Sequence, residues 1–292
     1  MTEFPPCPYD LLSLVLTLAP LPSADEPAEV PPWWGRAAQA LLLDLVRRAD
    51  PSLAQSLHDD PGTPPYTTST LMGHFREHHF LPGETYTLRL TALNAPLSGI
   101  LWQAAQPGGT LAPGAKLELD YRPLTVQAAA WQPQGHPWAA ATTYTELAAG
   151  YLMPNRPPDR HLALLFTSPT AFRTNGHNTA LPTPELVFGS LLNRWNAFSP
   201  LTFPPEMRRY AAECLVASRF ELSSRVAPGK DSSFRVGAVG QATYTSTHYD
   251  RYWMSVSSTL AAYSLFAGVG AATGAGMGQC RRVESGSSAA PS

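Results

Sequence analysis

The stretch from residue 234 to 283 most constrains the fold of this 292-residue chain, because four local patterns succeed one another within it. It reads as a strand, a helix, a glycine-rich loop and a closing strand. Glycine permits positive φ and close backbone approach, which suits a tight packing loop or a loop of N–H donors that binds phosphate. Arg281 and Arg282 follow the loop, and fixed positive charge there favours a phosphodiester ligand. The loop contains Gly268, Gly270, Gly274, Gly276 and Gly278.

Three other interpretations of this loop fit less well. A dinucleotide fingerprint follows a strand and opens a helix, whereas this loop follows a helix. A P-loop ends in Gly-Lys-Ser/Thr, which is missing here. No formal charge lies between Arg251 and Arg281, but the interval is mostly Ala, Ser, Thr and Gly, too weakly apolar to predict a membrane span. A polyanion site and a packing loop without a ligand both stay open.

The order of predicted elements gives the fold class. The first half predicts a short helix from Pro51 to His58, helices at 36–49 and 97–104, and strands at 10–20, 66–80, 84–95 and 116–131. The second half predicts helices at 185–198, 205–217 and 252–267, and strands at 161–168, 219–227, 234–246 and 277–283. Leaving out the extra helices, each half reads βαββαβ, which is the ferredoxin-like pattern. We therefore expect an α+β protein with tandem ferredoxin-like domains.

The domain boundaries follow from composition. Residues 133–160 are rich in Pro and Gly and are expected to hold the junction, which gives domains at 1–140 and 141–284. The tail 285–292 is expected to be disordered. Residues 1–150 carry 7 Lys and Arg against 14 Asp and Glu, a net charge of −7, and residues 151–292 carry 13 against 8, a net charge of +5. This asymmetry favours a polyanion site on the second domain.

The cysteines and the N-terminal segment bear on the compartment. Cys7, Cys214 and Cys280 have no metal-ligand spacing, which favours a reduced, cytoplasmic setting. The apolar run 11–18 follows Glu3 and Asp10 with no Lys or Arg, so a buried strand is a better interpretation than a signal peptide.

Four stretches together resemble one known family. They are Pro51–His58, Tyr66–Ser69 with Gly83–Arg89, Phe166–Arg173, and Gly237–Gly240 through Gly278-Gln279. Their order along the chain is similar to that of the CRISPR-associated endoribonucleases, members of the repeat-associated superfamily that cut precursor RNA within its repeats.

The resemblance implies a reaction and a set of partners. The reaction is metal-independent cleavage by the substrate's own 2′-hydroxyl, which leaves a 2′,3′-cyclic phosphate and a 5′-hydroxyl and needs no cofactor. The partners are the CRISPR repeat RNA, as precursor and as mature guide, and a CRISPR interference complex. No membrane is involved, and the protein is expected to be a monomer or a homodimer. The alternative is a subunit that binds repeat RNA with little or no cleavage.

The family's catalytic histidine matches His58, at the end of Leu-Ala-Gln-Ser-Leu-His. An unperturbed histidine pKa of about 6.5 suits a general base or acid, and His58 is expected to be the base. A helix C-terminus with Asp59 and Asp60 beside it also favours the protonated form, which suits an acid.

The chain also departs from the family. Some members have a tyrosine in the preceding helix and a lysine soon after the histidine, whereas this chain has no tyrosine there and no lysine before Lys116. The general acid and the group that stabilises the transition-state charge therefore stay unassigned, with His74, His78 and Ser69 as accessory candidates. A metal site at His74 and His78 is disfavoured, because the segment reads as strand or loop and no carboxylate or cysteine completes it.

The RNA contacts are predicted from basic residues of the second half and from the glycine loop. The chosen side chains are Arg173, Arg194, Arg208, Arg209, Arg225, Lys230, Arg235, Arg251, Arg281 and Arg282. They would hold the phosphate backbone of the repeat.

Overall fold

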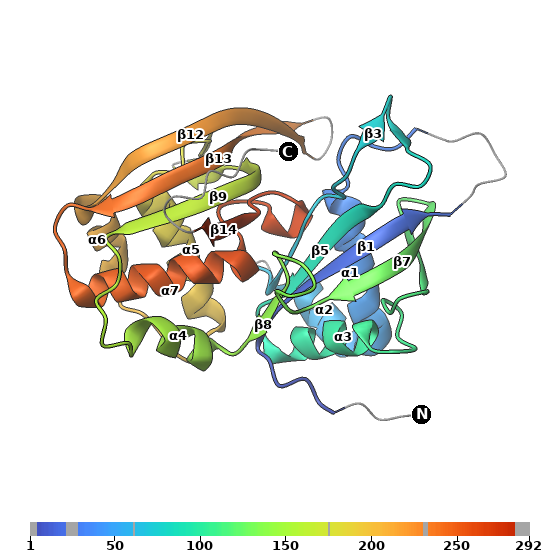
Figure 1. Cartoon of the computed structure of the whole chain (residues 1–292), viewed down its shortest axis with the longest axis horizontal. Helices are drawn as coiled ribbons and strands as arrows, with labels where there is room; N and C mark the ends of the chain where they lie inside the picture. The colour runs from blue at the N-terminus through green and yellow to red at the C-terminus, as the bar shows by residue number, and fades with distance from the viewer. Residues whose placement is uncertain (1–4, 22–28, 61, 175, 230–232, 284–292) are drawn as a thin grey trace. The chain divides into compact units, whose positions relative to one another are not determined.

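The computed structural model describes residues 5–21, 29–60, 62–174, 176–229 and 233–283 (Figure 1). They fall into two compact units. Unit 1 lies within Met1–Thr142 and includes Gly274–Gly276, and unit 2 lies within Thr143–Thr273 and Met277–Ser292. No helix among the described residues combines the length and the apolar character that a membrane crossing needs.

Unit 1 is a mixed α+β unit built on one antiparallel sheet. Its helices are α1 (Gly35–Ala49), α2 (Pro51–Asp59) and α3 (Ala95–Ala105). Its strands are β1 (Leu11–Pro20), β2 (Tyr66–Thr68), β3 (Phe75–Arg76), β4 (His79–Phe80), β5 (Tyr86–Ala92), β6 (Lys116–Leu119), β7 (Arg122–Ala130) and β8 (Ala140–Thr142).

The sheet of unit 1 has the order β2-β5-β1-β7-β6, and β8 also pairs with β1. Strand β1 thus lies between β5 and β7 with β2 outside β5, as in a ferredoxin-like unit. The register of β1 with β5 runs from Leu12↔Ala92 to Leu18↔Tyr86. The leucines at 12, 14, 16 and 18 share one face by the period of two and are buried in the core. Helix α1 contributes its apolar stripe, including Leu42 and Val46, to the same core.

Unit 2 is a second mixed α+β unit. Its helices are α4 (Tyr144–Leu152), α5 (Pro184–Phe198), α6 (Glu206–Cys214), α7 (Arg251–Ala267) and the short 3-10 helix η1 (Thr273–Ala275), which ends in unit 1. Its strands are β9 (His161–Thr170), β10 (Phe172–Thr174), β11 (His177–Thr179), β12 (Leu215–Pro228), β13 (Phe234–Ser246) and β14 (Cys280–Val283).

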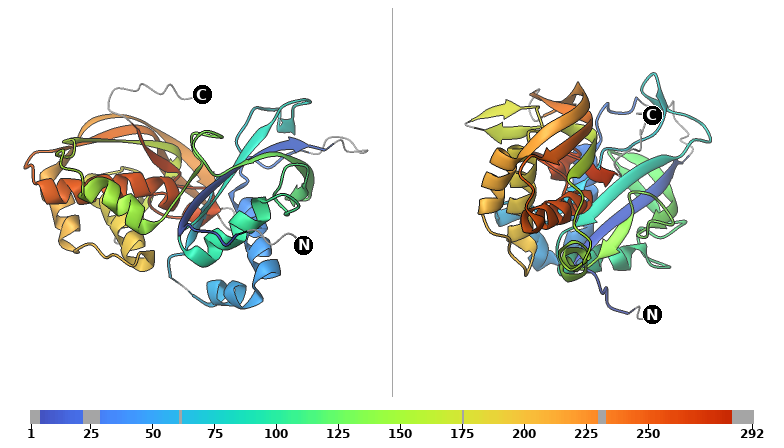
Figure 2. Two further views of the ribbon diagram at one scale, coloured as in Figure 1. Left: turned by 60° about the horizontal axis from the view of Figure 1, so that its bottom comes forward. Right: turned by 60° about the vertical axis from the view of Figure 1, so that its left-hand side comes forward.

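The four-stranded sheet of unit 2 has the order β12-β13-β9-β14, again the ferredoxin-like arrangement. Its helices lie on one side of the sheet (Figure 2). An aromatic cluster fills the core beneath them: Trp195 contacts the rings of Tyr144, Phe203 and Tyr263 at centroid distances of 5.0, 4.9 and 5.2 Å. The expected fold class, α+β with tandem ferredoxin-like domains, is confirmed.

Several predicted elements differ in detail. The predicted strand 66–80 is β2 followed by the β3–β4 hairpin, and the predicted strand 116–131 is the β6–β7 hairpin. The predicted helix 205–217 ends at Cys214, where β12 begins. The predicted junction at 133–160 contains β8 and α4. The predicted tail, 285–292, and residues Lys230 and Asp231 of the predicted hairpin turn lie outside the described residues.

Candidate active site

Helix α2 carries His58 in its last turn, and its start is fixed by an N-cap. The carboxylate of Asp50 accepts hydrogen bonds from the backbone N–H of Ser52 at 3.0 Å and of Leu53 at 2.9 Å. These bonds, above all the one from Leu53, lower the pKa of Asp50 below its ordinary value. Pro51 occupies the first helical turn, where its missing N–H costs nothing. The Asp-Pro pair therefore sets where α2 begins.

Helix α2 is held to unit 1 by one half-buried face. Leu53, Ala54 and Leu57 pack against the core cluster of unit 1, but no residue of the helix is fully buried. A nine-residue helix is marginal on its own, so the cap and this apolar face must supply its stability. His58 is exposed at its C-terminal end.

The two carboxylates that follow His58 are engaged by other donors. Gln55 donates from Nε2 to Asp59 at 2.9 and 3.0 Å, and the backbone N–H of Gly62 donates to Asp60 at 2.7 Å. Within the described residues, the imidazole of His58 forms no hydrogen bond or ion pair, and no group of three metal-ligating side chains exists. The imidazole can therefore exchange a proton with a ligand on its exposed side.

The accessory candidates do not gather around His58. Ser69 is 1% exposed, and its hydroxyl accepts a hydrogen bond from the backbone N–H of Arg89 at 2.9 Å, so nothing in this conformation supports its predicted accessory role, which stays a prediction. His74 and His78 are exposed on the β3–β4 hairpin. This hairpin and α2 lie at different ends of unit 1 (Figure 2, left). His78 has a positive φ of 61°, so it does not share a helical face with His74.

The middle of the glycine-rich loop is a packing element of unit 1. The carbonyl of Gly274 accepts a hydrogen bond from Thr68 at 2.9 Å, and that of Ala275 accepts one from Trp33 at 3.0 Å. A Cβ on Gly35 would lie 1.9 Å from the carbonyl oxygen of Ala275. Gly276 has a φ of +92°, and a Cβ there would lie 2.9 Å from the Trp33 ring. These glycines are therefore explained by close backbone packing.

The flanking glycines of the loop use their N–H groups within unit 2. Gly268 donates to Ser264 at 2.9 Å, Gly270 to the hydroxyl of Ser190 at 2.9 Å, and Gly278 to Pro169 at 3.0 Å. A phosphate cannot accept from amides that already donate to protein oxygens. These hydrogen bonds favour the packing interpretation for the three glycines, and their predicted contact with RNA phosphate stays a prediction.

The predicted RNA-contacting arginines divide by their surroundings. Arg208 donates to Asn193 at 3.0 Å, Arg209 pairs with Glu213 at 2.9 Å, and Arg251 donates to two backbone carbonyls. Arg281 is half-buried, and Arg282, also half-buried, lies 5.3 Å from the ring centroid of Tyr151. Lys230 lies outside the described residues. Those with exposed side chains and no partner among the described residues are Arg173, Arg225 and Arg235.

Arg194 is the buried member of this group among the described residues. It is 7% exposed on the buried side of α5, and it donates to the hydroxyl of Thr273 at 2.6 Å. Burial lowers the pKa of its guanidinium. These contacts give it a structural role within unit 2, and its predicted contact with RNA stays a prediction.

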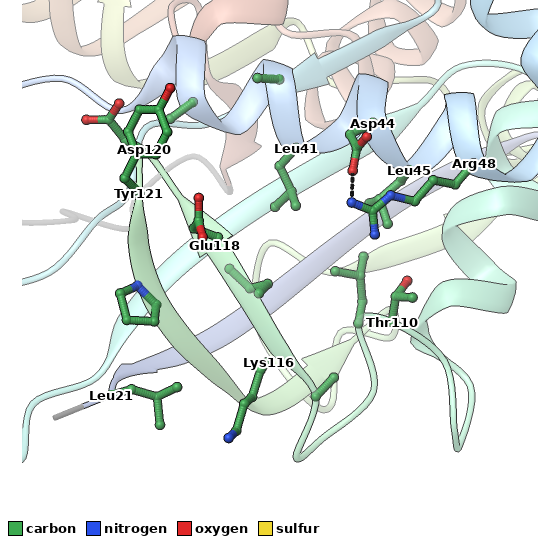
Figure 3. A pocket seen from close by; sticks show the side chains of 16 residues that line it. Leu21, Leu41, Asp44, Leu45, Arg48, Thr110, Lys116, Glu118, Asp120 and Tyr121 are labelled. Atoms are coloured by element: carbon green, nitrogen blue, oxygen red, sulfur yellow. Dashed lines mark ion pairs between the residues drawn. The ribbon is translucent and has the colours of Figure 1, made fainter. Parts of the chain in front are cut away.

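A cavity of about 750 Å³ lies in unit 1 between α1 and the β6–β7 hairpin (Figure 3). Its charged lining consists of the bases Arg48 and Lys116 and the acids Asp44, Glu118 and Asp120. Arg47 and Arg48 lower the pKa of Asp44 by hydrogen bonds and charge, Arg47 most. Acids outnumber bases, and His58 does not line the cavity, so it suits neither an RNA backbone nor the chemistry of His58.

The comparisons with known proteins agree with one another. Residues 164–280 match the family model of the CRISPR-associated endoribonuclease Cas6. A Cas6 endoribonuclease of Mycobacterium tuberculosis (strain CDC 1551 / Oshkosh) is 32% identical over 128 residues, which are 43% of this chain and 40% of that relative. The match thus spans less than half the length of the curated relative.

Solved structures are similar over most of the chain. The product complex of Cas6 (TTHA0078) is 29% identical, with a TM-score of 0.72 over 94% of this chain and 99% of that chain. The product complex of the Thermus thermophilus protein Cas6 (TTHB231) is 29% identical, with a TM-score of 0.74 over 94% and 100%. By family model, sequence and structure alike, this chain is similar to the CRISPR-associated Cas6 endoribonucleases.

Proposed function

We propose that this protein is a metal-independent endoribonuclease that cleaves CRISPR precursor RNA within its repeat. The observation that carries the proposal is the exposed imidazole of His58, held at the end of α2 without a protein partner among the described residues. The match to Cas6 endoribonucleases and the likeness to Cas6 product complexes support repeat RNA as the substrate.

In this reaction His58 acts as the general base. One ring nitrogen accepts the proton of the substrate's 2′-hydroxyl, and the oxygen attacks the adjacent phosphorus. The new P–O2′ bond closes the cyclic phosphate while the P–O5′ bond breaks, and the leaving 5′-oxygen takes a proton to become a hydroxyl. General acid–base catalysis by one side chain contributes roughly 10²- to 10⁴-fold to such a rate.

RNA binding is assigned to exposed arginines of unit 2. Arg173 on β10 and Arg235 on β13 lie on neighbouring segments, because β11, the partner strand of β10, packs against β13. Fixed positive charge at these sites neutralises phosphates and makes the affinity fall with salt. A repeat hairpin would be held through its backbone and shape.

The test is single-turnover cleavage of one repeat RNA in EDTA by the unsubstituted chain and by His58→Ala. We expect a discrete cut that ends in a cyclic phosphate, and a rate about 10²- to 10⁴-fold lower in the variant with unchanged RNA affinity. His161→Ala removes an exposed histidine of unit 2 and serves as the matched control. Cleavage that survives His58→Ala, or that needs a divalent metal, would overturn the proposal.

The second candidate is a subunit that binds repeat RNA without cutting it. The observation that favours it is the lack of tyrosine in α1 and of lysine before Lys116. Tight binding of the repeat with no cut, under conditions that fold the protein, would select this candidate. A repeat RNA with a 2′-deoxy sugar at the cleavage position, which can bind but not react, gives the reference affinity.

A further inference from the structure

Strand β12 is a long exposed edge of the unit 2 sheet. It spans 14 residues and pairs on one side with β13, whereas no strand among the described residues pairs with its other side (Figure 1). Between Arg219 and Pro228 its register with β13 is continuous, because the one irregularity lies between Ala217 and Arg219. A regular edge of this kind offers a row of N–H and C=O groups to another strand.

The side chains of this edge are unusually apolar for a solvent-exposed strand. Phe220 is 65% exposed and Val226 is 60% exposed. Both lie on the same face of the strand, since they are six residues apart in a period of two. On β13, Val236 stands opposite Val226 and extends the apolar surface. Exposed large apolar side chains on an edge strand mark a surface that another chain covers.

We propose that two copies of this protein pair through β12, antiparallel about Ser223, to form one continuous eight-stranded sheet from two four-stranded sheets. This register places Phe220 opposite Val226 of the partner subunit. It also places Glu221 opposite Arg225 of the partner subunit, and the two-fold axis repeats both pairs. Cross-strand apolar and opposite-charge pairs are the units that stabilise an antiparallel sheet. This interface is independent of the proposed catalysis, because it uses no residue of unit 1.

The charges on β12 select this register among its neighbours. A pairing centred one residue earlier puts Arg219 opposite the partner's Arg225. Centres at 221 and at 225 put Glu221 and Arg225 opposite their own copies, and a centre at 224 leaves Glu221 opposite alanine. A centre at 220 would also pair Arg219 with Glu221, but it carries the pairing across the irregularity between Ala217 and Arg219 and places Val226 opposite no residue of β12. The register about Ser223 pairs Glu221 with Arg225 and Phe220 with Val226 at the same time. The exposed Phe220 and Val226 favour a protein strand over an RNA backbone as the occupant of this edge.

The test exploits the symmetry of the pairing. Glu221→Arg puts arginine opposite the partner's Arg225, and Arg225→Glu puts two glutamates opposite each other. Each single variant is expected to raise the dimer Kd roughly tenfold to a hundredfold, because two cross-strand pairs change sign together. The double variant restores both pairs in reversed order. An equimolar mixture of the two single variants pairs every arginine with a glutamate, so it is expected to dimerise when neither component alone does.

The assay is sedimentation equilibrium of the full chain without RNA, with circular dichroism to show that each variant is folded. A symmetric cross-link is the second readout: Ser223→Cys stands opposite its own copy and is expected to form an intermolecular disulfide on mild oxidation, since directly paired strand residues lie within disulfide reach. Ala217→Cys, an exposed site away from the axis, is the control and is expected not to cross-link.

The inference would be overturned if the protein were a monomer at every concentration, or if the charge reversals left the Kd of the dimer unchanged. Single reversals that weaken RNA binding but leave self-association unchanged would also overturn it, since these would assign the edge to RNA. Dimerisation that is restored both in the double variant and in the mixture of single variants supports the inference. Cleavage by the His58 site is measured separately, so its failure leaves this result intact.

Discussion

The position of His58 depends on a helix with little buried surface, so removing the apolar contacts of α2 should uncouple catalysis from binding. The perturbation is Leu53→Ala with Leu57→Ala. Alanine has the higher helix propensity, so the double variant removes packing without removing intrinsic helicity. Fully burying a leucine contributes about 1.5–3 kcal/mol. Each of these half-buried side chains therefore contributes about 1 kcal/mol, and the pair about 2 kcal/mol.

A loss of about 2 kcal/mol raises the opening constant of α2 by roughly thirtyfold. Hydrogen exchange of the amides of Ala54 and Asp60, which donate to Asp50 and Ser56, should accelerate by that factor. Single-turnover cleavage should slow by at most the same factor, with RNA affinity unchanged. Ser56→Ala, on the exposed side of the same helix, should alter neither quantity much. Faster exchange of α2 with undiminished cleavage would refute the argument that α2 positions His58.

Three further predictions concern stability and RNA affinity. In urea denaturation, Gly99→Ala should stabilise unit 1 by about 0.5–1 kcal/mol, since Gly99 lies in a helix with open space at its Cβ. Gly276→Ala should destabilise unit 1 by about 1–3 kcal/mol. If both substitutions changed the free energy of unfolding in the same direction, the packing argument would be contradicted. Burial raises the pKa of Tyr263 above its ordinary value of 10, so this tyrosine stays neutral when folded, and its contribution to stability is complete below pH 10. Above pH 10 Tyr263 loses its proton in the unfolded chain before it does in the folded chain. The free energy of unfolding should therefore fall by about 1.4 kcal/mol per pH unit for this residue. Tyr263→Phe should remove this pH dependence, whereas Tyr121→Phe, at an exposed site, should leave it unchanged. Arg235→Ala should reduce the slope of log affinity against log salt by about 0.7–0.9, and an unchanged slope would remove Arg235 from the RNA contacts.

The sequence predicted the long, strongly periodic elements and missed those with weak local signals. The apolar stripe of α1 and the Asp50-Pro51 start of α2 were readable, because caps and periodicity are local. Two hairpins were predicted as single strands because their turns carry Glu77-His78 and Asp120-Tyr121 at positive φ. Such turns usually carry Asn-Gly or Asp-Gly, and neither of these two residue pairs is a recognisable turn signal.

Helix α4 was also missed, although a readable signal precedes it. Thr143 and Glu146 form a reciprocal capping box, with bonds of 3.0 and 3.1 Å. A Thr-x-x-Glu pattern before Leu-Ala-Ala marks a helix start. The Pro- and Gly-rich composition of residues 133–160 led to the prediction of a domain junction there. Composition averages over the whole segment, so it does not detect a capping pattern of four residues.

The candidate site was predictable only where a residue's role depends on its own element. His58 ends a helix that the sequence defines, so its exposure follows from the amphipathic pattern of Leu53 and Leu57. The burial of Ser69 and Arg194 was not predictable from the sequence, because it depends on segments distant in sequence. For Arg194 that segment is the loop at Thr273, whose hydroxyl accepts its hydrogen bond.

The same dependence on distant segments applies to the glycine-rich loop. Glycine spacing reports where backbones approach closely, but it does not say whether the second backbone belongs to a ligand or to the protein. Here the carbonyls of Gly274 and Ala275 are bound by Thr68 and Trp33 of unit 1, so the close approach is internal. Fixed charge and glycine density therefore become evidence for a phosphate site only once the N–H groups are shown to lack protein acceptors. Applied to this chain, that criterion favours the packing interpretation of the loop, and the proposed chemistry depends instead on the exposed imidazole of His58.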